Sequence, residues 1–85
     1  MTTLQEQFAQ AQADYKALPE LSSTTKLKAY ALAKQGSIGD VEGPQPAATD
    51  DLRRSKWDAW NALKGTSKET AQEKYIELVQ EFSKR

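Results

Sequence analysis

The most informative stretch of this chain reads Lys56-Trp57-Asp58-Ala59-Trp60-Asn61-Ala62-Leu63-Lys64-Gly65-Thr66-Ser67-Lys68-Glu69. Its apolar residues recur at helical intervals as far as Leu63, and Gly65 stands where a left-handed C-terminal cap belongs. The next four residues have the Thr-x-x-Glu form of a capping box, in which Thr66 is the N-cap and Glu69 its partner. The stretch therefore predicts one helix, a glycine stop and a second helix.

Working outward from this stretch, the apolar pattern extends both helices. The first begins at Asp50-Asp51, which supply an N-cap and a negatively charged first turn. The residues expected on its inward face are Leu52, Ala59, Trp60 and Leu63. The second continues to the end of the chain on a stripe made of Ala71, Tyr75, Leu78, Val79 and Phe82.

Two further helices are predicted nearer the N-terminus. The stripe that indicates the first consists of Leu4, Phe8, Ala11, Tyr15 and Leu18. Thr2 or Thr3 supplies its cap, and Pro19 stops it. The next helix begins among the N-cap formers of residues 22–25 and runs to about Gln35, where Gly36 ends it.

The segment 36–50 holds three of the four glycines and two of the three prolines, without apolar periodicity. It therefore predicts a long ordered loop of the kind that serves a site or covers a core. No alternating strand pattern and no internal repeat competes with the helices. The expected fold class is all-α, with four helices in one domain spanning residues 1–85.

The composition narrows the classes of function. Twelve basic residues balance twelve acidic ones, so no general affinity for nucleic acid is implied. The chain has no cysteine and no histidine, which removes disulfides, zinc-thiolate sites, the thiol nucleophile and the commonest general base. The longest apolar run, at 29–33, is too short to cross a membrane, and the N-terminus does not resemble a signal peptide. We expect a non-enzymatic, cytoplasmic protein without membrane insertion.

The local charges suggest a ligand. The expected second helix carries three lysines and no acidic residue, namely Lys26, Lys28 and Lys34. After its acidic start at Asp50-Asp51, the third helix carries one further acid, Asp58, against four cations, which are Arg53, Arg54, Lys56 and Lys64. Tyrosines lie among these charges, and lysine neutralises phosphate while tyrosine offers a stacking face and a hydroxyl. The pattern favours an anionic ligand with an aromatic ring, with solvated surface lysines as the simpler alternative.

The opening stretch, residues 56–69, closely resembles the signature of the acyl-CoA-binding protein family. A second segment, Tyr30-Ala31-Leu32-Ala33-Lys34-Gln35-Gly36-Ser37-Ile38-Gly39-Asp40, is similar to the family's helix-two and loop motif. Tyr75-Ile76 stands where the family has its helix-four tyrosine. The resemblance covers the chain from about Phe8 to its end.

The resemblance implies an up-down-down-up bundle of four helices that binds long-chain fatty acyl-CoA thioesters. We expect a monomer by default, with self-association through exposed groove residues as the alternative, and neither a cofactor nor a metal. The resemblance assigns Lys34 and Lys56 to the phosphates, and Tyr30 and Tyr75 to the nucleotide end. Lys16 completes the basic rim. Leu27 and Ala33 are expected on the groove face of the second helix. The spacing of Tyr30 and Lys34 agrees, because residues four apart project from one side of a helix.

Structural alternatives exist for each of these residues. Tyr30 and Tyr75 also lie on apolar stripes and fit a core role. Lys34 fits the favourable interaction of a cation with a helix C-terminus. Lys56 precedes two tryptophans and its stem could cover them, while Trp60 is assigned mainly to the core.

The chain departs from the family pattern on its second helix. Ala33 stands where the family has an aromatic residue that stacks on the adenine. Such stacking is worth about 1 to 3 kcal/mol, so its loss lowers affinity by about 5- to 150-fold unless another ring substitutes. On the same groove face of this helix, Ala29 replaces a larger aliphatic residue and Lys26 replaces a Met or Leu. These changes predict a retained fold with an altered pocket.

Three classes of function follow. The leading one is a carrier and buffer of acyl-CoA. The second is an interaction or regulatory module that keeps the bundle but has altered or lost its ligand, as Ala29 and Ala33 suggest. The third is an enzyme acting on CoA esters, such as a thioesterase, against which the absence of histidine and cysteine argues.

Overall fold

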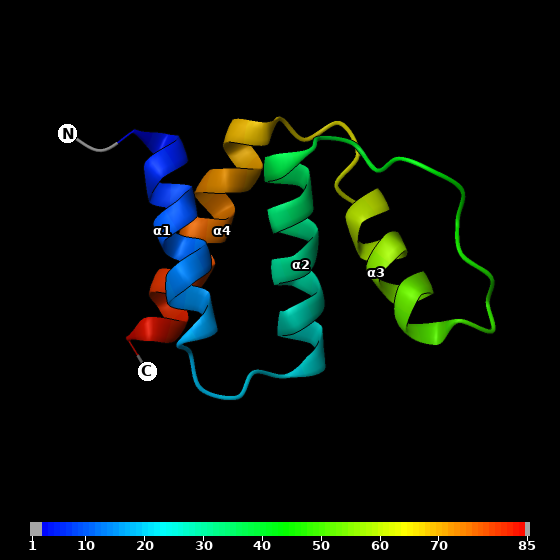
Figure 1. The fold of residues 1–85 in the computed structure, drawn as a ribbon, viewed down its shortest axis with the longest axis horizontal. Helices are drawn as coiled ribbons and strands as arrows, with labels where there is room; N and C mark the ends of the chain where they lie inside the picture. The colour runs from blue at the N-terminus through cyan, green and yellow to red at the C-terminus, as the bar shows by residue number, and fades with distance from the viewer. Residues whose placement is uncertain (1–2, 85) are drawn as a thin grey trace.

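A computed structural model describes residues 3–84, which form four helices and no strand. The helices are α1 (Leu4–Lys16), α2 (Ser23–Ser37), α3 (Asp51–Asn61) and α4 (Lys68–Ser83). In Figure 1, α2 and α3 run in one direction, and α1 and α4 run in the opposite one. The predicted all-α class and the up-down-down-up order are therefore confirmed.

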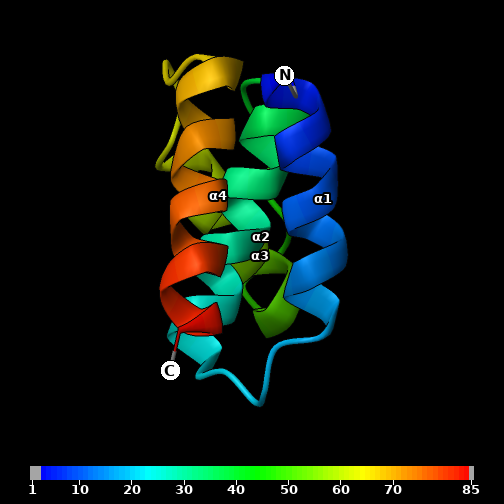
Figure 2. The ribbon, with the colours of Figure 1, turned by 90° about the vertical axis from the view of Figure 1, so that its left-hand side faces the viewer.

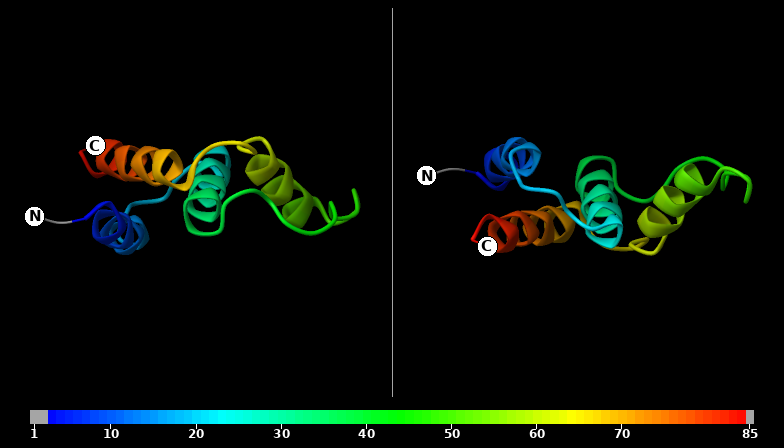
Figure 3. Two further views of the ribbon diagram at one scale, coloured as in Figure 1. Left: turned by 90° about the horizontal axis from the view of Figure 1, so that it is seen from above. Right: turned by 90° about the horizontal axis from the view of Figure 1, so that it is seen from below.

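The helices form an elongated and rather flat body, with extents of 43 × 27 × 15 Å. Helix α4 packs against both α1 and α2, and α2 in turn packs against α3. Figure 2 shows α1 and α4 side by side, and Figure 3 shows α3 on the far side of α2 from them. Helix α3 consequently lies at the edge of the fold, and we call the α2–α3 pair the wing.

The core lies among α1, α2 and α4. Its buried members are Phe8, Ala11, Ala29, Leu32, Ala71, Tyr75, Leu78 and Val79. Helix α3 contributes Trp60, which is buried and whose indole Nε1 donates a hydrogen bond of 2.8 Å to the Gly39 carbonyl. This bond ties α3 to the loop that leaves α2.

Three helices begin at side-chain caps. Thr3 and Glu6 form a full capping box at α1, while Ser22 caps α2 by accepting the Thr25 amide. Thr2 lies outside the described residues. At α4 the predicted box of Thr66 and Glu69 is wrong, because Ser67 is the cap and accepts the Thr70 amide.

The cap of α4 is displaced because the backbone of Thr66 is used elsewhere. Its amide donates to the Leu63 carbonyl at 2.9 Å, and its carbonyl accepts the Gln35 side-chain amide at 2.7 Å. Thr66 thus belongs to the turn after α3. Gly65 adopts the predicted left-handed conformation, with φ of +91°.

Three predicted helix ends are wrong. Helix α3 ends at Asn61, so Leu63 lies in the turn that follows it. Helix α1 ends at Lys16, so Leu18 and Pro19 follow it, and Leu18 is not on its stripe. Helix α2 continues through Gly36 to Ser37. Gly36 is needed for packing instead, because a Cβ there would lie 3.0 Å from Gln72 Cγ and 3.1 Å from Phe8 Cζ.

The start of α3 also differs from expectation. Asp50 is at the N-cap position, but its side chain makes no capping hydrogen bond and pairs with Arg53 at 3.5 Å instead. Leu52 is not on the inward face, since it remains 64% exposed. Its exposure follows from the position of α3 at the edge of the fold, where only one side of the helix meets α2.

Candidate ligand-binding site

Three of the predicted site residues meet around one aromatic ring. The Lys56 ammonium of α3 lies 5.2 Å from the centroid of the Tyr30 ring on α2, and the Lys34 ammonium lies 5.8 Å from it. Lys34 is also 5.8 Å from the Trp60 ring. Neither lysine forms an ion pair within residues 3–84, so two uncompensated positive charges face an aromatic platform.

Beside this cluster, α2 and α3 enclose a groove of about 440 Å³, which we call the front groove. It is lined by Ser23, Lys26, Leu27, Tyr30, Asp51, Leu52, Ser55 and Lys56. Four of these lining residues were not predicted from the sequence, namely Ser23, Asp51, Leu52 and Ser55. Their i, i+3, i+4 spacing was the available signal, because it places them on the faces that carry Tyr30 and Lys56.

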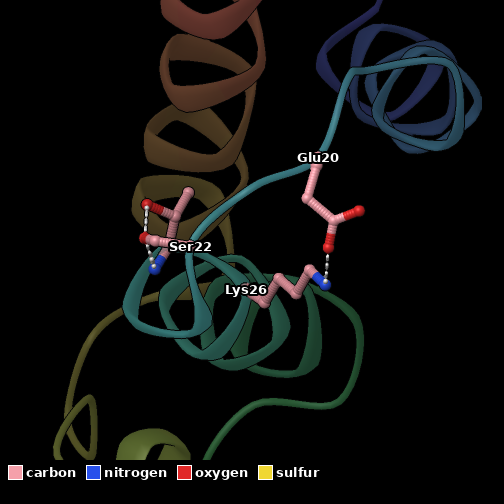
Figure 4. A network of polar contacts seen from close by, with 4 residues as sticks. Glu20, Ser22 and Lys26 are labelled. Carbon is pink, nitrogen blue, oxygen red and sulfur yellow. Dashed lines mark hydrogen bonds and ion pairs between the residues drawn. The ribbon is translucent and has the colours of Figure 1, made fainter.

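Lys26 borders the front groove but its ammonium is engaged elsewhere. It lies 3.4 Å from a Glu20 carboxylate oxygen in the loop between α1 and α2 (Figure 4). Both side chains are largely exposed, and exposed pairs of this kind contribute about 0 to 1 kcal/mol. Lys26 therefore offers its aliphatic stem to the groove and its charge to solvent and Glu20.

Tyr75 is a core residue rather than a member of this cluster. It is 3% exposed, its ring meets Phe8 edge-on at 5.4 Å, and it lies 6.0 Å from the Tyr15 ring. Burial raises the pKa of Tyr75 to about 12, with a smaller contribution from Tyr15. Its predicted role at the nucleotide end stays a prediction.

The remaining predicted residues are dispersed. Lys16 is exposed in the last turn of α1, and among the described residues no hydrogen bond or ion pair joins it to Tyr30, Lys34 or Lys56. Ala33 is partly buried and packs against the core.

Ala29 is buried in the core at 2% exposure. The expectation that Ala29 lies on the groove face is wrong, because that position of α2 faces the other helices of the core.

A polar network holds the α2 end of the site in place. Gln35 is fully buried, and its side-chain amide donates to Asp40 at 2.9 Å and to the Thr66 carbonyl at 2.7 Å. The Gly65 amide also donates to Asp40, at 2.9 Å. These two donors lower the pKa of Asp40. The network joins the end of α2 to the α3–α4 turn and so positions Lys34 relative to Trp60.

A second and larger groove lies on the other face of the α2–α3 pair. This back groove has a volume of about 890 Å³ and is bordered by α2, α3 and α4. Its lining is formed by Thr24, Thr25, Leu27, Lys28, Ala31, Leu32, Ala59, Leu63, Lys74, Glu77, Leu78, Glu81 and Phe82. It was not foreseen, because a cavity between helices depends on their separation and not on the pattern of any one helix.

The site combines the elements that an amphiphilic anion requires. Paired ammonium groups attract phosphate or carboxylate oxygens, and the Tyr30 ring can stack on a planar group. The adjoining groove shields apolar atoms from water. The described helices do not include one long and apolar enough to cross a bilayer.

The sequence is similar to one family of known proteins. Residues 5–79 match the family described as acyl CoA binding protein. The chain is 44% identical over 80 residues to acyl-CoA-binding domain-containing protein 1 of Oryza sativa subsp. japonica, covering 93% of this chain and 88% of that protein. It is 39% identical over 84 residues to enoyl-CoA delta isomerase 2 of Rattus norvegicus, covering 98% of this chain and 22% of that protein.

The solved structures agree with the sequence relatives. The crystal structure of Oryza sativa Acyl-CoA-Binding Protein 2 superposes with a TM-score of 0.93 at 38% identity, covering 96% of this chain and 92% of that one. The family predicted from residues 56–69 is thereby confirmed: this chain belongs to the acyl-CoA-binding protein family.

Proposed function

We propose that this chain binds long-chain fatty acyl-CoA thioesters and carries them in the cytoplasm as a monomer, without changing them chemically. Acyl-CoA binding is the function of its family. The observation that supports the proposal most is the Tyr30 ring held near the free ammonium groups of Lys34 and Lys56 beside the front groove. In this proposal residues 1–85 act as a single binding domain.

The nucleotide end is held by charge in this proposal. The phosphates of CoA contact Lys34 and Lys56, and Tyr30 contributes its ring and hydroxyl. Because Ala33 supplies no ring, Tyr30 and Trp60, whose rings lie near the Lys34 ammonium, take part in stacking in this proposal. Lys16 and Tyr75 remain proposed contributors at the rim.

The acyl chain supplies most of the affinity. Each methylene removed from water contributes about 0.8 kcal/mol, so ten shielded methylenes offer about 8 kcal/mol before ordering costs. The front groove, with Leu27 and Leu52 in its lining, is the proposed seat of the chain. The lysines add orientation and a salt-sensitive contribution.

A binding role without catalysis fits the available side chains. The chain lacks histidine and cysteine, and the two lysines at the site hold phosphates in this proposal and do not activate a nucleophile. The isomerase relative is a much longer protein of which this chain matches 22%, so its activity is not transferred to this chain.

The test is a comparison of lysine variants in acyl-CoA titrations. Lys34→Ala and Lys56→Ala should each weaken palmitoyl-CoA binding by about 10- to 100-fold, because each removes a charge-assisted contact worth about 1.5 to 3 kcal/mol. Their affinities should also depend less on salt than that of the wild type. Calorimetric titration at two salt concentrations measures both effects.

Lys28→Ala is the matched control, since Lys28 is an exposed lysine of α2 that borders the back groove instead. It should change the palmitoyl-CoA affinity by less than twofold. Equal losses in all three variants would contradict the assigned phosphate contacts. Absence of palmitoyl-CoA binding to the wild type would overturn the function itself and favour an interaction module.

A further inference from the structure

Leu27 is shared by the two grooves of the α2–α3 wing. It borders the front groove together with Tyr30 and Lys56, and it borders the back groove together with Ala31 and Ala59. Within the described residues no other side chain lines both cavities. The partly buried side chain of Leu27 therefore stands in the wall that separates them.

The back groove side of this wall carries two small side chains. Ala31 lies one turn after Leu27 on α2, and Ala59 lies one turn after Ser55 on α3. Alanine carries nothing beyond its Cβ, so beside Ala31 and Ala59 the Leu27 side chain is the larger apolar group. Shortening Leu27 removes that bulk without touching Tyr30, Lys34 or Lys56.

The space behind the wall suits an apolar chain. The back groove is about twice as large as the front groove, at about 890 Å³ against about 440 Å³. Its apolar lining includes Leu32, Leu63, Leu78 and Phe82, while charged side chains stand among the lining residues of α2 and α4. An alkyl chain that passed Leu27 would leave water and contact these apolar side chains.

We propose that Leu27 limits the length of acyl chain that the protein shields, by closing the front groove toward the back groove. This inference rests on the proposed binding of acyl-CoA at the front groove. In the wild type the affinity rises with chain length until the front groove is filled, and further methylenes stay in water. Without the Leu27 side chain the two grooves join, and the end of a longer chain enters the back groove.

The test is a chain-length series of saturated acyl-CoAs, from octanoyl through palmitoyl to lignoceroyl, titrated against wild type and Leu27→Ala. The wild-type affinity should reach a plateau within the series. The Leu27→Ala plateau should move to longer chains, with a gain of up to about fourfold in affinity per methylene beyond the wild-type plateau. An unchanged plateau would overturn the proposal.

Leu63→Ala is the matched control, because Leu63 is also a partly buried leucine but borders only the back groove. It should keep the wild-type plateau, and an equal shift in this variant would refute the specific role of Leu27. If Leu27→Ala does not fold, Leu27→Phe is tested in its place. A larger side chain in the wall should leave the plateau at the wild-type length or move it to shorter chains, and a move to longer chains would again refute the proposal.

The series separates this inference from the function on which it rests. Absence of binding at every chain length in the wild type would remove both. If wild type and Leu27→Ala bind acyl-CoA with the same plateau, only the role of Leu27 is refuted and acyl-CoA binding stands.

Discussion

At the scale of single residues, Tyr30 and Tyr75 lie in different environments. Tyr30 faces two ammonium groups beside a groove, whereas Tyr75 is buried against Phe8 and Tyr15. Both lie at positions that fit an apolar stripe, so their sequence positions alone left a core role open for each. The distinction comes from α3, which brings Lys56 to Tyr30 and has no counterpart beside Tyr75.

The burial of Tyr75 predicts a distinct alkaline transition. Its pKa is raised to about 12 because burial disfavours the tyrosinate, and this value exceeds the ordinary value of 10. Neutral Tyr75 therefore stabilises the fold fully below pH 10, and the contribution is lost as the pH rises from 10 toward 12. Tyr75→Phe should remove a tyrosinate absorbance change that is centred at a pH of about 12. An absorbance difference between wild type and Tyr75→Phe that is centred at pH 10 would contradict the burial of Tyr75.

The proximity of two proposed site residues was predictable where one helix carries both. Tyr30 and Lys34 were placed together because one helical turn separates them. The contact of Lys56 with Tyr30 was anticipated only through the family resemblance, since it joins two helices. Ala29 was misassigned because the pattern of α2 is apolar on more than one side, and only packing decides which side meets the core.

At the scale of elements, helix existence was predictable and helix ends were less so. The apolar periodicity was sufficient to predict all four helices, because each helix has one face in contact with a neighbouring helix. The N-cap of α4 is Ser67 and not Thr66, because the distant side chain of Gln35 donates a hydrogen bond to the Thr66 carbonyl. No local pattern contains that information.

Gly36 shows how packing can replace a helix stop. Gly36→Ala should lower the free energy of unfolding by about 1 kcal/mol, because overpacking against Phe8 and Gln72 costs about 1 to 3 kcal/mol and exceeds a helix-propensity gain of about 1 kcal/mol. Ser37→Ala, at the exposed neighbouring position, should stay within about 0.5 kcal/mol of wild type. Urea unfolding measures both, and a stabilised Gly36→Ala would show that the α2–α4 contact is looser than described.

The junction of α2 with the α3–α4 turn should weaken in acid. Hydrogen bonds from the Gly65 amide and from Gln35 lower the pKa of Asp40 below its ordinary value of 3.8. Their stabilising effect is thus fully present above pH 3.8 and is lost as the pH falls through the lower folded-state value.

Asp40→Ala should therefore be less stable than wild type at neutral pH, and the difference should shrink in acid. Thermal unfolding across this range measures it. Glu42→Ala, which alters an exposed carboxylate of the same loop, should leave the wild-type acid dependence in place. A stability difference for Asp40→Ala that is independent of pH would contradict the role of its carboxylate.

At the scale of the whole molecule, the position of α3 creates the site. Helix α3 packs against α2 and stands apart from the α1–α4 pair, as Figure 3 shows, so a groove remains on each face of the α2–α3 wing. The order of the helices was predictable from the family resemblance. The two grooves and the position of Leu27 between them were not, because they depend on the distance between helices.

The central claim is that one end of the ligand is held by charge at Lys34 and Lys56 while the other is shielded from water beside Leu27. The most direct measurement is calorimetric titration of delipidated protein with palmitoyl-CoA, free CoA and palmitate at moderate salt. The account predicts tight one-to-one binding of the thioester and much weaker binding of either fragment, since each fragment engages only one end. Equal affinities for palmitoyl-CoA and free CoA, or no binding of the thioester, would contradict it.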